Sequence, residues 1–152
     1  MRQKRQDLGL VSHGLIEREL TGRIIECFFM VYNTLGFGML ESVYRHALVV
    51  ELSRHGLDAR QEVPIDVIYR GVEVGHFRLD VLVEQKIAVE VKATELLSRT
   101  ASRQLLNYLR ASHLDVGLLL HFGPEPRFHR VVSPRVLSRA REERIRQFPK
   151  DP

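Results

Sequence analysis

Apolar residues recur at helical spacing in two stretches near the start of the chain. In the first, between residues 15 and 33, apolar positions fall three or four residues apart, which predicts an amphipathic helix. These positions are Ile16, Leu20, Ile24, Phe28 and Val31. The second stretch runs from about residue 39 to residue 55 and stops at Gly56, a residue type that commonly ends helices. The glycine-containing segment 35–38 separates them, so the sequence predicts two consecutive helices.

Beyond residue 61 the pattern changes to an alternation of apolar and polar positions. Alternation over 63–68 and again over 72–84 predicts two strands, with a turn at 70–71. On the second strand we expect one face to hold Phe77, Leu79, Val81 and Val83. A short turn at 85–86 leads into the apolar segment 87–92, so these segments predict a three-stranded antiparallel meander.

The second half of the chain predicts one more helix and two more strands. Helical spacing returns at 99–111, and the nearly all-apolar run 116–121 is typical of a strand buried on both faces. Residues 128–132 predict an edge strand, and the segment from residue 134 predicts either a basic helix or disorder. The element order is α-α-β-β-β-α-β-β. We therefore expect an α/β (α+β) domain in which helices flank a mixed central sheet that contains the antiparallel meander.

Composition restricts the class of protein. Of the 152 residues, 44% are hydrophobic and 28% are charged, which fits one folded domain. Cys27 is the single cysteine, so internal disulfides and multi-cysteine zinc sites are excluded and a reducing compartment is expected. The sequence has no apolar run of about 18 residues and no apolar signal core after its charged start. We therefore expect a cytoplasmic protein that has no membrane partner.

The net charge of +4 is concentrated at the two ends of the chain. Residues 1–7 carry +2 and residues 134–152 carry +3, whereas residues 8–133 carry −1. We therefore expect a basic arm at 1–14, a folded domain at 15–132 and a basic tail at 133–152. Basic tails strengthen contacts with nucleic-acid phosphates, but they also act as solubilising segments, and the charge pattern leaves both interpretations open.

Charged residues interrupt the apolar strands of the meander. Glu90 and Lys92 lie two positions apart in an apolar strand, so their side chains project from one face. Asp80 lies on the preceding strand, and a hairpin that turns at 85–86 places it opposite Glu90. Two facing carboxylates repel each other unless a cation neutralises them, and Mg²⁺ is typically held by one or two carboxylates. The three residues suggest a metal site, and a structural buried ion pair is the alternative.

Other chemically capable residues fit a site less well. The rival set Asp66, Glu84 and Lys86 has two members on a predicted turn, where charged side chains are simply hydrated, so we reject it. We expect structural or surface roles for the histidines and the cysteine, because no pair of them has convincing ligand spacing. These residues are Cys27, His76, His121 and His129.

Two further pairs of residues share helix faces. Gln104 and Tyr108 are four residues apart on the predicted helix 99–111, where they either contribute to a site or flank the helix in solvent. Glu41 and Tyr44 are three residues apart near the start of the second helix. An acid in the first turn also stabilises the helix dipole, which is the alternative role for Glu41.

Taken in order, these motifs resemble the GxxExxY protein family, which is placed within the PD-(D/E)XK nuclease superfamily. The signature motif is Gly38-Met-Leu-Glu41-Ser-Val-Tyr44. The resemblance covers about residues 15–132 and continues through Val63-Pro64, Arg78-Leu79-Asp80, Val89-Glu90-Val91-Lys92-Ala93, Gln104-Leu-Leu-Asn-Tyr108 and Phe122-Gly-Pro-Glu-Pro126. Leu79 stands where many superfamily members have a proline before the aspartate, and that proline is often absent.

The resemblance implies a PD-(D/E)XK restriction-endonuclease-like core and a role for each motif residue. Asp80, Glu90 and the backbone carbonyl of Val91 would bind Mg²⁺ or Mn²⁺. Lys92 would orient or activate the attacking water and stabilise charge on the phosphate, and Glu41 would approach the metal directly or through water. Gln104, like Lys92 and Glu41, would be a catalytic residue. The residues that would contact nucleic acid are Gln104, Tyr108 and Tyr44.

The function implied by this resemblance is that of a metal-dependent nuclease, which hydrolyses phosphodiester bonds of DNA or RNA. We expect nucleic acid as the partner, DNA more than RNA, and an edge strand at 127–132 that could pair in a homodimer. The alternatives are a catalytically inactive nucleic-acid-binding module and a protein-interaction module on the same fold. The sequence is compatible with a single- or a double-stranded substrate, cut internally or from an end.

Overall fold

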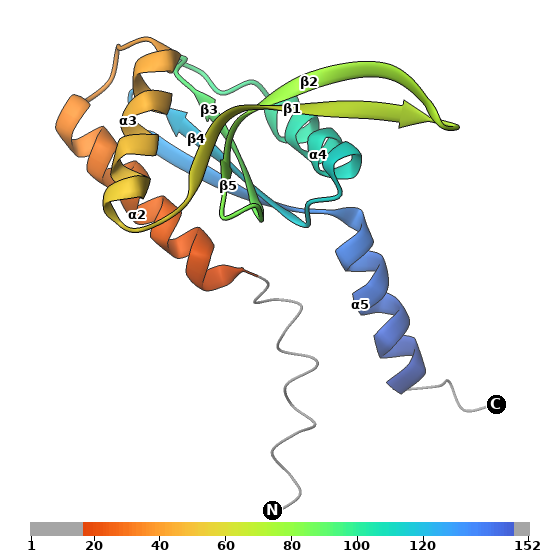
Figure 1. Cartoon of the computed structure of the whole chain (residues 1–152). Coiled ribbons are helices and arrows are strands. Elements are labelled where there is room, and N and C mark those ends of the chain that lie inside the picture. Colours follow the sequence, from red (N-terminus) through yellow and green to blue (C-terminus); the bar gives the residue numbers. More distant parts are fainter. Residues whose placement is uncertain (1–16, 148–152) are drawn as a thin grey trace, which may run out of the picture.

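The computed structural model describes residues 17–147, and Figure 1 shows the helices and strands in the predicted order with one more helix at the end. The helices are α2 (Arg18–Leu35), α3 (Glu41–Arg54), α4 (Thr100–Ser112) and α5 (Pro134–Gln147). The strands are β1 (Ala59–Tyr69), β2 (Val72–Val83), β3 (Ile87–Lys92), β4 (Val116–Phe122) and β5 (Pro126–Val132).

The five strands form one mixed sheet in the order β1-β2-β3-β4-β5. β1, β2 and β3 make the predicted antiparallel meander. β3 and β4 are parallel and are connected through α4, and β5 pairs with β4 in the antiparallel direction at the edge of the sheet. The predicted α+β class with a mixed central sheet is therefore confirmed.

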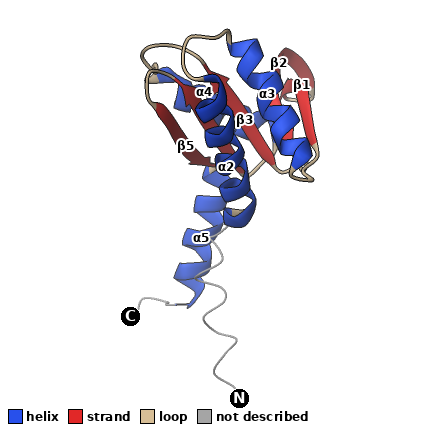
Figure 2. Cartoon of the chain, turned by 90° about the vertical axis from the view of Figure 1, so that its left-hand side faces the viewer, coloured by secondary structure: helices blue, strands red, loops and turns tan. Residues whose placement is uncertain are grey.

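Helices cover both faces of the sheet and bury an apolar cluster on each (Figures 1 and 2). The cluster beneath α2 and α3 includes Phe28, Tyr44, Leu48, Val89, Val91 and Leu118. The cluster beneath α4 includes Leu79, Ala88, Leu105, Leu109 and Leu119. Since successive strand residues point to opposite faces, Glu90 and Lys92 share the face of Ala88, which is the face that α4 covers.

The apolar side chains of β2 change face at Asp80. Val81 and Val83 lie in the cluster with α2 and α3, whereas Phe77 and Leu79 lie with α4. Our expectation that these four residues share one face is therefore wrong. The β1–β2 ladder is regular on either side of Asp80, but Glu62, which lies opposite, has a left-handed backbone with a φ of 50°. This conformation, uncommon outside glycine, interrupts the pleat and lets the hairpin bend over α4.

Helix α5 extends away from the sheet, as Figure 2 shows from the side. Its first turn packs on the domain, because Val136 is buried and Arg135 Nη2 lies 3.3 Å from Asp115 Oδ1. A helix rather than disorder therefore occupies residues 134–147, whereas the basic arm expected at 1–14 lies outside the described residues. Between residues 17 and 147, none of the helices combines the length and the apolar character that crossing a membrane requires.

Candidate active site

Asp80 and Glu90 lie on neighbouring strands where the β2–β3 ladder ends. The last pair of the ladder in this direction is Val81 with Val89, so the next positions along the two strands are Asp80 and Glu90. Beyond this pair, the side chain of Asp80 bonds to β3 in place of the backbone, because its Oδ2 accepts a hydrogen bond of 2.8 Å from the backbone N–H of Val91. The register that we predicted from the turn at 85–86 therefore brings the two acids together.

Lys92 joins this pair from the same face of β3. Its Nζ lies 3.1 Å from Glu90 Oε1, and the side chain is 26% exposed, whereas that of Glu90 is 8% exposed. The ion pair is therefore open to solvent on the lysine side. Within the described part of the chain, Glu90 Oε2 is buried without a hydrogen-bond partner, which leaves one carboxylate oxygen able to accept a ligand.

Burial raises the pKa of both acids, and for Glu90 the charge of Asp80 adds to this effect. Burial, followed by the charge of Asp80, raises the pKa of Glu90 to about 7. Burial also raises the pKa of Asp80, although the Val91 amide, Lys92 and Arg45 oppose the rise. For Lys92, burial lowers the pKa, but the charge of Glu90 and the hydrogen bond to it raise the pKa overall. Lys92 is therefore protonated at neutral pH and suits charge stabilisation better than proton abstraction.

The loop before α3 places Glu41 beside this cluster. Gly38 has a φ of 107°, a conformation that residues with a side chain rarely adopt, so the first position of the Gly-x-x-Glu motif requires glycine. The chain then enters α3, whose first residue is Glu41. The Glu41 charge raises the pKa of both Glu90 and Lys92, which places it within electrostatic range of the two.

Tyr44 is a core residue and is fully buried. Its ring stacks on Phe122 at 4.3 Å between centroids, its hydroxyl donates to the carbonyl of Gly36, and the hydroxyl accepts from the Met39 N–H. The structure therefore contradicts our expectation that Tyr44 contacts nucleic acid. Its two hydrogen bonds hold the 36–39 loop that leads into Glu41.

We expect Tyr44→Phe to lower the free energy of unfolding by about 1–3 kcal/mol, because two partly buried hydrogen bonds to the 36–39 loop are lost. Urea denaturation of the variant measures the loss. Tyr69→Phe is the matched control, since Tyr69 is 60% exposed and its replacement should change stability by no more than about 0.5 kcal/mol. Equal effects of the two substitutions would contradict the role assigned to the Tyr44 hydroxyl.

Gln104 and Tyr108 reach the cluster from α4. The Tyr108 ring stacks on Phe77 at 3.9 Å between centroids, and Gln104 forms a hydrogen bond with the Tyr108 side chain. Burial, followed by the charge of Glu90, raises the pKa of the Tyr108 hydroxyl. The predicted i, i+4 pair therefore faces the acids, and Phe77 fixes the orientation of the Tyr108 ring.

Arg45 is a member of the site that sequence analysis did not identify. Its Nη1 lies 4.0 Å from Asp80 Oδ1 and its Nη2 lies 3.8 Å from Glu62 Oε1, so it connects α3 to the bend in the hairpin. Its position one turn after Glu41 on the same helix face is the signal that could have indicated it. Arg45 offsets part of the negative charge of Asp80 and restrains its position.

We expect Arg45→Met to raise the pKa of Asp80, because the Arg45 charge lowers it in the native protein. A ¹³C NMR titration that follows the Asp80 carboxyl carbon measures the change. Arg54→Met, on the last turn of the same helix, should leave that titration unaltered. A midpoint for Asp80 that is the same in all three proteins would show that Arg45 does not act on it.

The donor set fits a hard divalent cation of the kind that the resemblance implies. Within residues 17–147 no three His, Cys, Asp or Glu side chains lie together as a ready-made cation site. Mg²⁺, however, is usually held by one or two carboxylates, with water and substrate phosphate completing its coordination. Asp80 and the unpartnered Oε2 of Glu90 supply the carboxylates. The N–H and C=O of a strand residue lie on the same edge, so the Val91 carbonyl also points toward β2.

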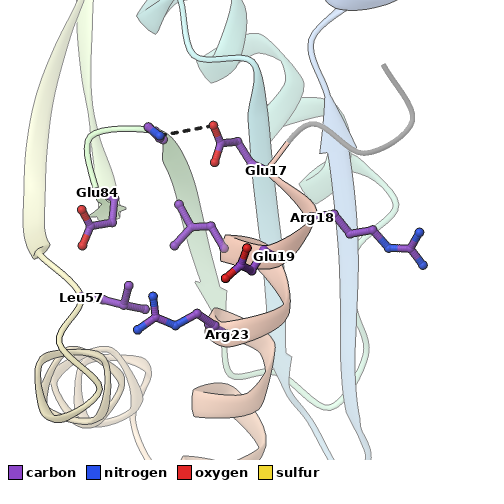
Figure 3. A pocket seen from close by; sticks show the side chains of 8 residues that line it. Glu17, Arg18, Glu19, Arg23, Leu57 and Glu84 are labelled. Carbon is purple, nitrogen blue, oxygen red and sulfur yellow. Dashed lines mark ion pairs between the residues drawn. The ribbon is translucent and has the colours of Figure 1, made fainter. Parts of the chain in front are cut away.

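The rejected set of Asp66, Glu84 and Lys86 does not come together. Asp66 pairs with His76 in the outer part of the hairpin, far along β1 from the β2–β3 turn that carries Glu84 and Lys86. These two line a cavity of about 440 Å³ at the other end of β3 from Glu90 (Figure 3). There Lys86 Nζ lies 3.6 Å from Glu17 Oε1, which is an ordinary exposed ion pair.

Of the remaining candidates, His121 and Cys27 have structural roles, whereas His76 and His129 are exposed. His121 is buried on β4, and its Nε2 lies 2.7 Å from the carbonyl oxygen of Thr94, in the loop that follows Lys92. Cys27 is buried in the cluster beneath α2 and α3, and its burial raises the pKa of its thiol. A reactive thiolate is therefore not favoured there.

One comparison with known proteins, against family models, agrees with the geometry. A search of curated proteins found no match. A solved structure titled "Crystal structure of SSO0001" matches 93% of this chain and 75% of that chain, with 18% sequence identity and a TM-score of 0.47. The model of the PD-(D/E)XK nuclease superfamily matches residues 18–131, which include Glu41, Asp80, Glu90, Lys92 and Gln104. The chain therefore belongs to the PD-(D/E)XK nuclease superfamily.

Proposed function

We propose that this protein is a metal-dependent nuclease that hydrolyses phosphodiester bonds of DNA or RNA. The observation that supports this most is the meeting of Asp80, Glu90 and Lys92 at the end of the β2–β3 ladder, with a lysine open to solvent. Asp80 faces Glu90 and raises its pKa even though Arg45 and Lys92 lie beside the two acids, so the arrangement carries a cost to folding that a functional site explains.

The residues that would hold Mg²⁺ or Mn²⁺ are Asp80, Glu90 and the carbonyl of Val91. When bound, such an ion supplies a water of lowered pKa and neutralises charge on the phosphate. Asp80 and Glu90 would fix the ion against β3, and the hydrogen bond from Val91 N–H orients the Asp80 carboxylate for this role. Glu41 would approach from the start of α3.

Lys92 would stabilise the phosphate charge that grows during hydrolysis. Its ammonium is fixed by Glu90 at 3.1 Å, so no reorganisation is needed when the charge develops. Gln104 and Tyr108 would position the attacking water or the nucleic-acid backbone from α4. Their mutual hydrogen bond and the stacking of Tyr108 on Phe77 hold them in place for this role.

The finer identity is part of the same proposal. The Gly38, Glu41 and Tyr44 positions support membership of the GxxExxY family, because Gly38 forms the turn, Glu41 supplies the acid and Tyr44 anchors the loop in the core. DNA is the preferred partner in this proposal. Among residues 17–147, the edge strand β5 has no strand partner on one side, which would allow a second copy to pair in a homodimer.

Cleavage of mixed substrates tests the proposal. Single- and double-stranded DNA and RNA of one sequence are incubated with Mg²⁺, Mn²⁺ or EDTA, and wild type is compared with Asp80→Asn. We expect cleavage of at least one substrate with metal, none with EDTA and none by the variant. Binding of nucleic acid without cleavage under all conditions would favour an inactive binding module instead.

A further inference from the structure

We infer that a cavity next to Lys92 binds one unpaired nucleobase beside the scissile phosphate, so that the substrate is a single-stranded or locally unpaired nucleic acid. This inference rests on the proposed function and adds a substrate class to it. The cavity has a volume of about 250 Å³ and lies between the loop that follows β3 and the start of α4. Its lining residues are Lys92, Thr94, Leu96, Leu97, Ser98, Thr100, Ala101 and Gln104.

The cavity adjoins the candidate active site. Lys92 and Gln104 both line it. Lys92 also faces Glu90, and Gln104 also faces Tyr108. A nucleotide whose phosphate lay against Lys92 would therefore have its sugar and base within reach of the cavity. The volume is below the range of about 300–1,000 Å³ that is typical of drug-sized ligands, so the occupant is a single ring system rather than a longer stretch of chain.

Hydrogen bonds hold the walls of the cavity in shape. His121 Nε2, on buried β4, lies 2.7 Å from the Thr94 carbonyl oxygen. The Thr94 hydroxyl donates to the Leu96 carbonyl at 2.8 Å, and the Ser98 hydroxyl lies 2.7 Å from that of Thr100. A loop tied at these points forms its pocket before the ligand arrives, as small-molecule sites usually do.

The lining chemistry selects an uncharged, planar occupant. Among the residues that line the cavity, Lys92 is the only cationic one, and the proposed function assigns its charge to the scissile phosphate, so the cavity offers no further cation to a second phosphate. Leu96, Leu97 and Ala101 offer apolar surface to a ring. The hydroxyls and the Gln104 amide offer donors and acceptors to its edge. Leu96 is 86% exposed beside the cavity, so its side chain is accessible to a ligand that enters the cavity.

A base in a duplex cannot enter such a cavity. Both of its faces are stacked and its pairing edge is occupied, so it must leave the helix before a protein pocket can take it. A single strand requires no such unpairing, and apolar or aromatic contacts to its bases are tolerant of sequence. The cavity therefore favours unpaired nucleotides without specifying which base they carry.

Binding of a fluorescent single strand tests the inference separately from catalysis. Fluorescence anisotropy is measured in the presence of Ca²⁺ for wild type, Leu96→Ala and Leu137→Ala. The ligands are an intact single-stranded oligonucleotide, a set of the same strands with one abasic nucleotide at each position in turn, and the matching duplex. Leu137 lies on α5 and is 61% exposed, so it is the control for loss of an exposed leucine. Leu96→Ala should fold normally, because its side chain is almost fully exposed.

We expect wild type to bind the single strand roughly tenfold more tightly than the duplex, and one abasic position to cost a similar factor. Leu96→Ala should bind the intact strand less tightly than wild type does. It should bind the strand whose abasic position lowers the affinity of wild type as tightly as wild type does, and Leu137→Ala should match wild type on both strands. Equal binding of strand and duplex, no effect of any abasic position, equal behaviour of the two variants, or no binding would each overturn the inference. Failure of cleavage with retained abasic sensitivity would instead overturn only the proposed hydrolysis.

Discussion

Lys92→Met is expected to reduce the rate of phosphodiester cleavage by about 10²–10³-fold, the usual cost of removing one fixed group that stabilises transition-state charge. The side chain is 26% exposed and its ammonium faces Glu90 at 3.1 Å, so it can reach both the solvent and the acids. Methionine keeps most of the length and apolar volume and removes only the charge. The rate is measured on a labelled oligonucleotide at saturating Mg²⁺.

The chain contains its own control for this substitution. Lys86 is the last residue of a second Glu-x-Lys triplet, lies on the β2–β3 turn and pairs with Glu17 at 3.6 Å. Lys86→Met removes the same charge from a chemically similar sequence at the opposite end of β3, and the cleavage rate should stay within about twofold of wild type. Similar losses in both variants would mean that net positive charge, and not the position of Lys92, supports the activity.

Glu90→Gln is expected to stabilise the fold at pH 8 by up to about 3 kcal/mol while it removes the response to divalent metal. Burial and the charge of Asp80 raise the pKa of Glu90 from 4.5 to about 7. Because the folded-state pKa is above the unfolded-state value, Glu90 costs stability as the pH rises from about 4.5 to about 7, and the cost is constant above that range. Glutamine keeps the shape and avoids this ionisation.

Thermal denaturation between pH 4 and pH 8 measures this effect. The melting temperature of Glu90→Gln should exceed that of wild type by several degrees at pH 8, at about 2–4 °C per kcal/mol, and the difference should vanish near pH 4. Adding Mg²⁺ at pH 8 should raise the melting temperature of wild type only. Glu73→Gln, an exposed change on β2, should show neither effect. A variant that is less stable than wild type at every pH would contradict the strain assigned to Glu90.

The central geometry of the site could be predicted from sequence because local rules determine it. A period of two places Glu90 and Lys92 on one face of β3, and a tight turn at 85–86 sets the register that brings Asp80 beside them. The helical spacing of Gln104 and Tyr108 likewise gave their common face. In each case the relation spans a few residues or one hairpin.

The features that were missed depend on packing between distant elements. The bend at Glu62 is a backbone conformation that alternation cannot reveal, and it divides the apolar residues of β2 between two cores. Arg45 is in the site because α3 lies against the bent hairpin. Tyr44 belongs to the core because Phe122, far along the chain, provides the ring on which it stacks. The motif identified Tyr44 as an important residue, but it did not show that the side chain points into the core.

Titration of Mn²⁺, followed by the loss of the free-ion signal in electron paramagnetic resonance, tests most directly whether Asp80 and Glu90 form a cation site. We expect saturable binding of Mn²⁺ to wild type at pH 8, competition by Mg²⁺, and loss of that binding in Asp80→Asn. Wild type that binds no Mn²⁺ even with oligonucleotide present, or an Asp80→Asn variant that binds it as wild type does, would show that Asp80 and Glu90 do not form a cation site.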